Sequence, residues 1–337
     1  PPMLNYTIRR LLISIPTLLF ISLVIFLLLD LAPGDPMSSI PLTVPPEVKE
    51  KMREALGLGE PVHIRFLNWL YQFFVVEPQV AWDHLFGTDF AEGKQRIISF
   101  QSRSPVMTVV AERMPQTLWV VGLSYVIGIL IALPIGIISA YKQYSWFDQI
   151  GTFISMIGFS IPTFFSGVLL IVVFSVILQW FPSIYDTTHT VTDWSSFWYQ
   201  VKQMIMPVSV LALYNAAQIS RFMRASMLDN LNQDYVRTAR AKGMSEKVVV
   251  LSHVLRNSMI PVVTVIALGV PTIFGGAIIT EQVFQVNGLG QMLITAIYAS
   301  DAPMVQTLTF IFAVLIVLFN LIADILYGIL DPRIRYD

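Results

Sequence analysis

Asp234-Tyr-Val-Arg-Thr-Ala-Arg-Ala-Lys-Gly-Met-Ser-Glu-Lys247 is a polar run set between two long apolar segments, and His253-Val-Leu-Arg-Asn-Ser-Met-Ile-Pro261 follows it. From Arg221 to Arg256 the chain carries seven basic residues against three acidic ones. Basic loops also act as topogenic signals in membrane proteins, so charge by itself says little about binding. A structured basic loop between membrane segments would nevertheless suit a soluble partner on one side of a bilayer.

The helical organisation of this run is more specific than its charge. Tyr235 to Lys242 places alanines among long basic side chains, a composition that favours a helix. Gly243 stands where that helix would stop, and Ser245 is suited to be the N-cap of a second helix. The pattern predicts two short helices joined at a glycine, which together form a compact knob.

The composition of the whole chain indicates a membrane protein. Of its 337 residues, 55% are hydrophobic and only 13% are charged, whereas soluble domains carry about 25% charged residues. The absence of cysteine excludes disulfides, thiolate metal sites and cysteine nucleophiles. Because Pro1 and Pro2 precede Met3, we expect the native chain to begin at Met3. The first apolar run is too long for a cleaved signal peptide and should stay as an anchor.

Apolar runs of spanning length predict an all-α membrane protein with six transmembrane helices. A spanning helix needs about 20 mainly apolar residues, and six stretches qualify: residues 9–31, 115–140, 150–180, 204–222, 259–284 and 305–330. We therefore divide the chain into an N-terminal segment with the first span, an extracytoplasmic insertion, a five-span region that contains a cytoplasmic loop, and a cytoplasmic tail. Their bounds are 3–31, 32–113, 114–330 with the loop at 223–258, and 331–337.

Basic residues in the short loops predict that both termini are cytoplasmic. With the N-terminus inside, the inner segments would hold most of the Lys and Arg residues: Arg9, Arg10, Lys142, Arg221, Arg224, Arg237, Arg240, Lys242, Lys247, Arg256, Arg333 and Arg335. The two shorter outer loops hold Lys202 alone. The positive-inside rule favours this orientation.

The insertion after the first span is too long to be a simple connector. Pro46-Glu47, closed by Gly57, brackets a short helix, and Val62 to Val75 is rich in aromatic residues, as in helices at a membrane interface. We expect a small folded helical cap, the alternative being a poorly ordered loop.

Several polar or helix-breaking residues lie inside the predicted spans. Asn320 and Asp324 share one helical face, where they could form an ion or proton relay or a structural hydrogen bond; the structural role is favoured. A second group could line a translocation path or reflect close helix packing. Its members are Ser160, Pro162, Tyr214, Asn215, Gly275, Gly276 and Glu281.

The sequence provides no residues for an enzyme. It has no Gly-x-x-x-x-Gly-Lys-Ser/Thr phosphate loop, so by that route the chain cannot bind ATP. Its four histidines are isolated and show no metal-site spacing. We expect no catalytic, cofactor or metal residues in this chain, and no nucleic-acid partner.

The run Arg237-Thr-Ala-Arg-Ala-Lys-Gly243 resembles the "EAA" loop of ABC importer permeases, whose Glu-Ala-Ala-x-x-x-Gly pattern forms the coupling helix against the ATPase subunit. Ala239 and Gly243 match, whereas Arg237 and Thr238 replace the first two positions, as in the dipeptide and oligopeptide branch. The resemblance covers nearly the whole chain. Other matching motifs are Arg9-Arg10-Leu11, Pro33-Gly-Asp-Pro36, Leu56-Gly-Leu58, Phe86-Gly-Thr88, Pro115-Gln-Thr-Leu118, Leu255-Arg-Asn257 with Pro261, Glu281, Phe284, Gly288-Leu-Gly290, Asp324 with Tyr327-Gly328, and Asp331-Pro-Arg-Ile-Arg335.

This resemblance implies the type I ABC importer permease fold and, from the large cap, the "B" type of the dipeptide, oligopeptide and nickel family. It implies a chain in the bacterial or archaeal cytoplasmic membrane, in contact with lipid. It also implies a second homologous permease, two cytoplasmic ATPases that hold ATP and Mg, and an extracytoplasmic binding protein. The residues implied to contact the ATPases are Asp234, Tyr235, Arg237, Thr238, Ala239, Arg240, Ala241, Lys242 and Gly243.

Peptides are the implied cargo, with nickel chelates, glutathione or another small solute as alternatives. Two functions of other classes remain open. An ion-coupled secondary transporter would use Asp324 or Glu281 and work without ATP, and a membrane scaffold or receptor would use the basic loop to bind anionic lipid. Neither alternative accounts for motif matches along the whole chain.

Overall fold

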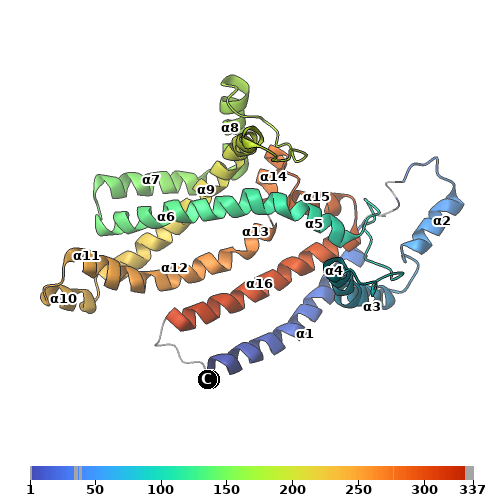
Figure 1. The fold of residues 1–337 in the computed structure, drawn as a ribbon, viewed down its shortest axis with the longest axis horizontal. Coiled ribbons are helices and arrows are strands. Elements are labelled where there is room, and N and C mark those ends of the chain that lie inside the picture. Colours follow the sequence, from blue (N-terminus) through green and yellow to red (C-terminus); the bar gives the residue numbers. More distant parts are fainter. Residues whose placement is uncertain (1, 34–36, 38–39, 276, 331–337) are drawn as a thin grey trace. The chain divides into compact units, whose positions relative to one another are not determined.

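The computed structural model describes residues 2–33, 37, 40–275 and 277–330, and these residues are predominantly helical (Figure 1). The sheet-like pairing among them is a single antiparallel bridge between Ile98 and Pro105. The all-α class expected from the apolar runs is therefore confirmed. The described residues form two compact units. The first contains the described residues 2–10, 116–275, 277–291 and 316–330, and the second contains 11–33, 37, 40–115 and 292–315.

The helices of the chain run in the following order. The N-terminal half contains α1 Pro2–Leu31, α2 Pro46–Ala55, α3 Val62–Tyr71, the π-helix η2 Gln72–Val76, α4 Glu77–Phe86, α5 Val106–Thr117, η3 Leu118–Gly122 and α6 Leu123–Tyr141. Next come α7 Trp146–Ser160, α8 Thr163–Leu170, η4 Ile171–Ile177, α9 Trp194–Leu231, α10 Asp234–Ala241, α11 Glu246–Val248 and η5 Val249–Val254. The last are α12 Leu255–Gly269, α13 Pro271–Gly275, α14 Ile278–Phe284, α15 Leu289–Tyr298 and α16 Ala302–Leu330.

Helices α6 and α9 form the central contact of the first unit (Figure 1). Their backbones approach closely because α6 carries glycine on the contact face. A Cβ atom at Gly136 would lie 2.7 Å from the carbonyl oxygen of Ser220, and one at Gly128 would lie 3.0 Å from that of Ala212. In membranes the hydrophobic effect does not drive helices together, because lipid tails are as apolar as the side chains. Close packing through small residues at helix crossings is therefore the usual source of attraction.

The third predicted span is broken rather than straight. Helix α7 and the helix formed by α8 and η4 meet at 98°, at a break between Ser160 and Thr163. Pro162 lies in this break and is the N-cap residue of α8. Proline restricts the residue before it to extended backbone, and Ile161 has φ −80° and ψ 125°. The sequence therefore ends α7 locally, and the direction of α8 follows from packing.

Among the described residues, fewer helices than the six predicted are both long and apolar enough to cross a membrane. Four helices qualify: Met3–Leu31, Val106–Tyr141, Glu246–Ile273 and Ala302–Leu330; the bent pair Trp146–Ser160 and Thr163–Ile177 makes a fifth if counted as one span. Helix α9 covers the predicted span at 204–222 but is not among these helices. The count of six stays a prediction.

The second unit contains the short helices that the sequence predicts between residues 46 and 76. Helix α2 begins at Pro46, and Gly57, at φ +73°, follows its last turn, as expected from the sequence. The aromatic segment is helical from Val62 to Val76, with Trp69 4% exposed and its Nε1 donating to Thr307 Oγ1 over 3.1 Å. Buried Asp301 accepts hydrogen bonds from Ser99 Oγ and from the Phe100 backbone N–H. These bonds tie the described residues of this segment to residues 301–307, while the extracytoplasmic insertion itself stays a prediction.

Candidate functional site

The polar run forms α10, and the helix ends in a turn at Gly243. The helix ends in a Schellman motif, in which Gly243 N–H bonds to Arg240 O at 3.0 Å and Met244 N–H bonds to Ala239 O at 3.4 Å. Gly243 has φ +78°, and no atom lies within 4 Å of the position that its Cβ would take. Glycine is required here by backbone conformation rather than by space.

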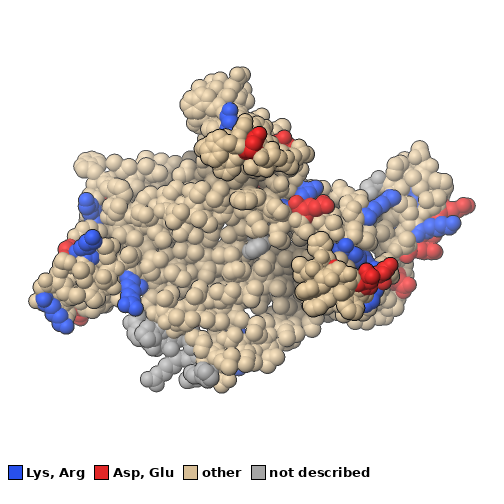
Figure 2. All heavy atoms as spheres, viewed as in Figure 1, with Lys and Arg blue, Asp and Glu red and all other residues tan. Residues whose placement is uncertain are grey.

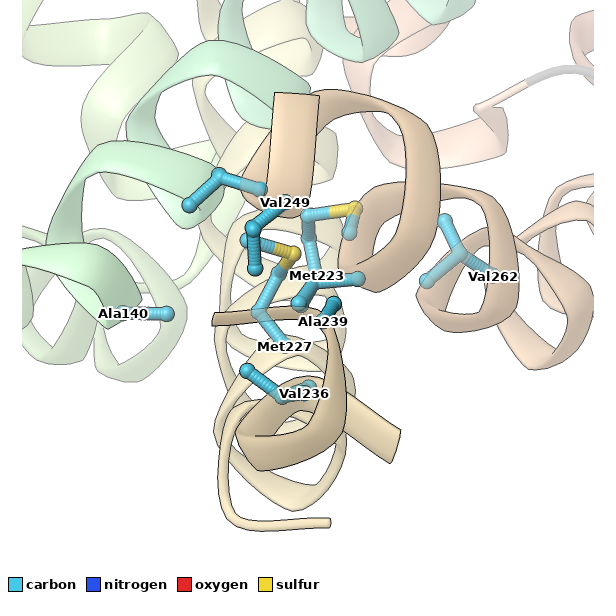
Figure 3. Close-up of a cluster of buried hydrophobic side chains, with 9 residues drawn as sticks. Ala140, Met223, Met227, Val236, Ala239, Val249 and Val262 are labelled. Carbon is cyan, nitrogen blue, oxygen red and sulfur yellow. The ribbon is translucent and has the colours of Figure 1, made fainter. Parts of the chain in front are cut away.

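One face of α10 is anchored in a hydrophobic cluster. Val236 and Ala239 are 1% and 7% exposed and pack with residues of α6, α9, η5 and α12 (Figure 3). The other buried members of the cluster are Ala140, Met223, Met227, Val249, Val250, Val254 and Val262. Apolar residues three apart face the same side of a helix. The cluster therefore fixes α10 to α6, α9 and α12.

The opposite face of α10 is exposed and basic. Arg237, Thr238, Arg240 and Lys242 are all exposed, and Figure 2 shows Lys and Arg side chains gathered where α10 and α11 lie. Arg240 pairs with Glu246 across the turn at 2.8 Å, with both side chains nearly half exposed. This face presents positive charge and hydrogen-bond donors on a rigid support, which suits an acidic protein surface.

Tyr235 connects α10 to the end of α9. Its hydroxyl donates to Asn230 Oδ1 at 2.8 Å. Partial burial raises the pKa of the Tyr235 phenol, while a hydrogen bond with Asn257 opposes the rise. The phenol therefore keeps its proton at neutral pH and remains a donor.

The second helix of the predicted pair is longer than expected. Ser245 does cap it, its Oγ accepting from Val248 N–H at 3.4 Å. The helix then continues through η5 and α12 as one segment, Glu246–Ile273. Likewise α9 extends to Leu231, so residues 223–231 of the predicted loop are helical. Both helices lengthen because the apolar faces around Met227 and Val249 are buried against each other.

The predicted path residues fall into separate places in the first unit. Ser160 and Pro162 are exposed at the bend after α7, and the ring of Tyr214 stacks on Phe159 next to them, with centroids 6.3 Å apart. Asn215 lies on the side of α9 that faces α6, since a Cβ atom added at Gly128 of α6 would lie 3.0 Å from the Asn215 Cβ atom. Gly275 ends α13, and Gly276 lies outside the described residues. Their role in a path stays a prediction.

Glu281 is enclosed by hydrogen bonds. It is 0% exposed, and Thr117 Oγ1 donates to its Oε1 while the Gln291 backbone N–H donates to its Oε2, each over 2.9 Å. Thr117 Oγ1 in turn accepts from the Leu289 N–H at 2.7 Å. A Cβ at Gly288 would lie 2.2 Å from Glu281 Oε1, so only glycine fits there. In this conformation Glu281 holds the α14–α15 turn.

Asp324 has a basic partner within the first unit. Its Oδ2 lies 2.9 Å from Nη2 of Arg10, and each side chain is 42% exposed. A carboxylate in an apolar span is costly unless it is paired. The contact therefore agrees with the structural role favoured from the sequence over an ion relay.

Sequence reasoning missed an ion pair that joins α7 to α9. Asp148, 2% exposed, accepts from Arg224 Nε at 2.7 Å and from its Nη2 at 2.9 Å. The same carboxylate accepts from the Tyr144 N–H at 2.9 Å. The two residues are 76 positions apart, so no local pattern could have paired them. Arg221, one turn before Arg224, lies over the ring of Phe159 at 5.6 Å.

Comparison with known proteins gives matches along the chain. Residues 132–336 match the family described as binding-protein-dependent transport system inner membrane component. Residues 3–121 match the N-terminal family of binding-protein-dependent transport system membrane components. Together these matches cover both the insertion and the helices that carry the basic face of α10.

Curated relatives are similar over nearly their full length. A Bacillus subtilis oligopeptide transport system permease protein is 39% identical over 338 residues, covering 99% of this chain and all of the relative. A putative peptide transport system permease protein of Brucella abortus is 35% identical, covering 98% of each chain. A glutathione transport system permease protein of Salmonella choleraesuis is 38% identical, covering 99% of this chain and all of the relative.

Proposed function

This chain belongs to the family of inner membrane components of binding-protein-dependent transport systems, the permeases of ABC importers, and on that premise we propose that it forms half of a translocation pathway for peptides. The cargo is inferred from relatives named for oligopeptide and peptide transport. The relative named for glutathione transport makes glutathione the second candidate.

The exposed face of α10 is the proposed contact with the cytoplasmic ATPases. The anchoring of the opposite face of α10 supports this proposal. Val236 and Ala239 on that face pack in a hydrophobic cluster shared with α6, α9 and α12. A movement of the ATPases that displaces α10 would then also displace those helices, because tightly packed elements move together as rigid bodies. In this proposal both termini and α10 are cytoplasmic, the insertion lies outside, and ATP and Mg are held by the partner subunits.

The cargo test is uptake by the reconstituted system. The chain is produced together with a second permease, the ATPases and a binding protein, and uptake of labelled di- and oligopeptides, glutathione and a nickel chelate is compared in proteoliposomes. We expect ATP-dependent peptide uptake that stops without the binding protein. Uptake of only the chelate, or uptake without ATP, would reject the proposal.

Gly243→Ala tests the turn after α10. Because the turn has φ +78° and open space around it, alanine should cost about 1 kcal/mol through left-handed backbone strain, and uptake should fall by less than about tenfold. Gly57→Ala in the cap, at φ +73° and also in open space, is the matched control and should leave coupling unchanged. Gly243→Trp adds bulk at a position where a Cβ atom meets no atom of this chain, so a much larger loss with Trp than with Ala would point to a partner surface against the turn. Full uptake by both Gly243 variants would contradict a transmission role.

Asp324→Asn separates the ABC importer from an ion-coupled carrier. Its half-exposed pair with Arg10 should contribute about 1 kcal/mol or less, so we expect uptake within about fivefold of wild type, still dependent on ATP and insensitive to ionophores. Arg10→Gln removes the basic partner of the same ion pair and should have the same small effect on uptake. Complete loss with Asp324→Asn but not with Arg10→Gln would favour the ion relay.

A further inference from the structure

Helix α7 buries little of itself within the first unit. The structure describes all 15 of its residues, and Asp148, which is 2% exposed, is the only buried one among them. Large apolar side chains along the helix, such as Phe153 and Ile154, are exposed. The cluster that anchors α10 draws its residues from other helices and includes none of α7. The position of α7 therefore depends on a small number of contacts.

Two of these contacts join α7 to α9 near its C-terminal end. A Cβ atom added at Gly158 would lie 3.6 Å from Ala217 Cβ, which is an ordinary van der Waals distance. The ring of Phe159 stacks on that of Tyr214. Apolar contacts are non-directional, and they permit the small sliding movements by which packed helices shift. These contacts alone would let α7 move along α9.

The ion pair between Asp148 and Arg224 is directional on both sides. Arg224 donates from Nε at 2.7 Å and from Nη2 at 2.9 Å to the two carboxylate oxygens, a bidentate geometry that fixes both groups. The carboxylate also accepts from the Tyr144 N–H, and the Asp148 N–H donates to Ser145 Oγ, so Asp148 is fixed to the start of α7. A slide of about 1 Å would stretch the Arg224 bonds out of range. The pair therefore holds α7 in register with α9.

Arg224 belongs to the part of α9 that anchors α10. It lies one position after Met223 and three positions before Met227. Both methionines are 0% exposed in the cluster that contains Val236 of α10 (Figure 3). Residues at these offsets project from neighbouring sides of a helix. The end of α9 thus holds α10 on one side and α7 on the next.

We propose that the Asp148–Arg224 pair makes α7 follow α9 and α10 during transport, and that these are two positioning residues of the transport cycle. A displacement of α10 reaches α9 through Met223 and Met227, and the closed ion pair passes it to α7 and to the bend at Pro162. Without the pair, ATP hydrolysis continues but α7 no longer follows. This inference rests on the proposed function.

Single substitutions separate coupling from assembly in the complete complex in proteoliposomes. Asp148→Asn and Arg224→Gln should each lower the number of substrate molecules imported per ATP hydrolysed by about tenfold, while the binding protein still stimulates the ATPase. Arg224→Lys keeps the charge but loses the bidentate geometry and should give an intermediate ratio. A parallel fall of uptake and stimulated ATPase activity, with the ratio unchanged, would overturn the proposal, because that is the effect of a purely structural ion pair.

A second ion pair provides the matched control. Arg96 and Glu77 in the second unit lie 2.8 Å apart, with side chains 23% and 8% exposed, against 28% and 3% for Arg224 and Asp148. Arg96→Gln should therefore disturb the protein to a similar degree but leave the ratio of import to hydrolysis at the wild-type value. An equal fall of this ratio in Arg96→Gln would also count against a specific link.

A cysteine pair tests the link itself. The chain has no cysteine, and D148C/R224C removes both charges together, which avoids the unpaired buried charge that can prevent a single variant from folding. With cysteine-free partner subunits, we expect a low ratio before crosslinking and a recovery of about tenfold when a short bifunctional thiol reagent joins the two positions. D148C alone, treated with the same reagent, should stay low. Failure of the joined pair to recover would overturn the proposal.

The wild-type complex separates the two possible failures. Absence of ATP-dependent peptide uptake by the wild-type complex would reject the proposed function. Normal wild-type uptake together with an unchanged ratio in Asp148→Asn and Arg224→Gln would reject the link alone.

Discussion

Replacing Val236 with aspartate should abolish uptake while leaving the membrane helices folded. Val236 is 1% exposed within the cluster that anchors α10 (Figure 3). A carboxylate there has no partner in an apolar environment, and unpaired buried charges cost about 3 kcal/mol or more. Because α10 has only eight residues, we expect it to detach before the long helices unfold.

Tryptic cleavage reports this detachment directly. The exposed Arg237 and Arg240 should be cut much faster in Val236→Asp than in the wild-type complex, and ATP-dependent uptake in proteoliposomes should fall below about 1% of wild type. Val248→Asp is the control, since Val248 is 40% exposed just beyond the turn and should retain most uptake. A Val236→Asp complex that transports normally would mean that α10 does not need its buried face.

Substitution of Gly136 should prevent α6 and α9 from packing. A Cβ there would lie 2.6 Å from Met223 Cβ and 2.7 Å from the Ser220 carbonyl oxygen, both atoms fixed to the α9 backbone. The helices must therefore separate. Overpacking typically costs about 1–3 kcal/mol, so Gly136→Ala should lower the thermal midpoint of the purified complex, and Gly136→Leu should give no assembled complex.

Alanine variants at two further glycines should show effects that follow how closely the neighbouring helix approaches. Gly128, whose Cβ would meet Ala212 O at 3.0 Å, should be intermediate, and Gly158, whose Cβ would meet Ala217 Cβ at 3.6 Å, should tolerate alanine. At Gly158 the gain in helix propensity, about 1 kcal/mol, should even raise the midpoint. Equal midpoints for all three alanine variants would show that the α6–α9 contact does not limit stability.

Features that depend on neighbours in sequence were predictable. Pro46 at the start of α2, Pro162 at the bend after α7, and Gly243 after α10 each act on the backbone within a few residues. The long motif matches identified the family because a chain-long pattern is rarely accidental. The predicted length of the second helix in the loop was wrong, since burial of Val249 and Val250 extends it into the next membrane helix.

Features that depend on residues far apart were not predictable. Asp148 and Arg224, and Glu281 and Thr117, meet only after their helices pack. The same holds for a cavity of about 790 Å³ in the second unit, which is lined by residues of α1, α2, α3 and the α15–α16 turn. No spacing rule connects such positions.

The sequence by itself determined the membrane class, the family, some of the helix ends and the presence of a basic helix with a glycine stop. Hydrophobic periodicity, capping and backbone restriction are local properties, and they are read within one or two turns. Only the tertiary structure decided which face of α10 is buried and that Gly243 is needed for its conformation rather than its size. These depend on packing between distant segments, which side-chain shape and burial fix only once the helices are together.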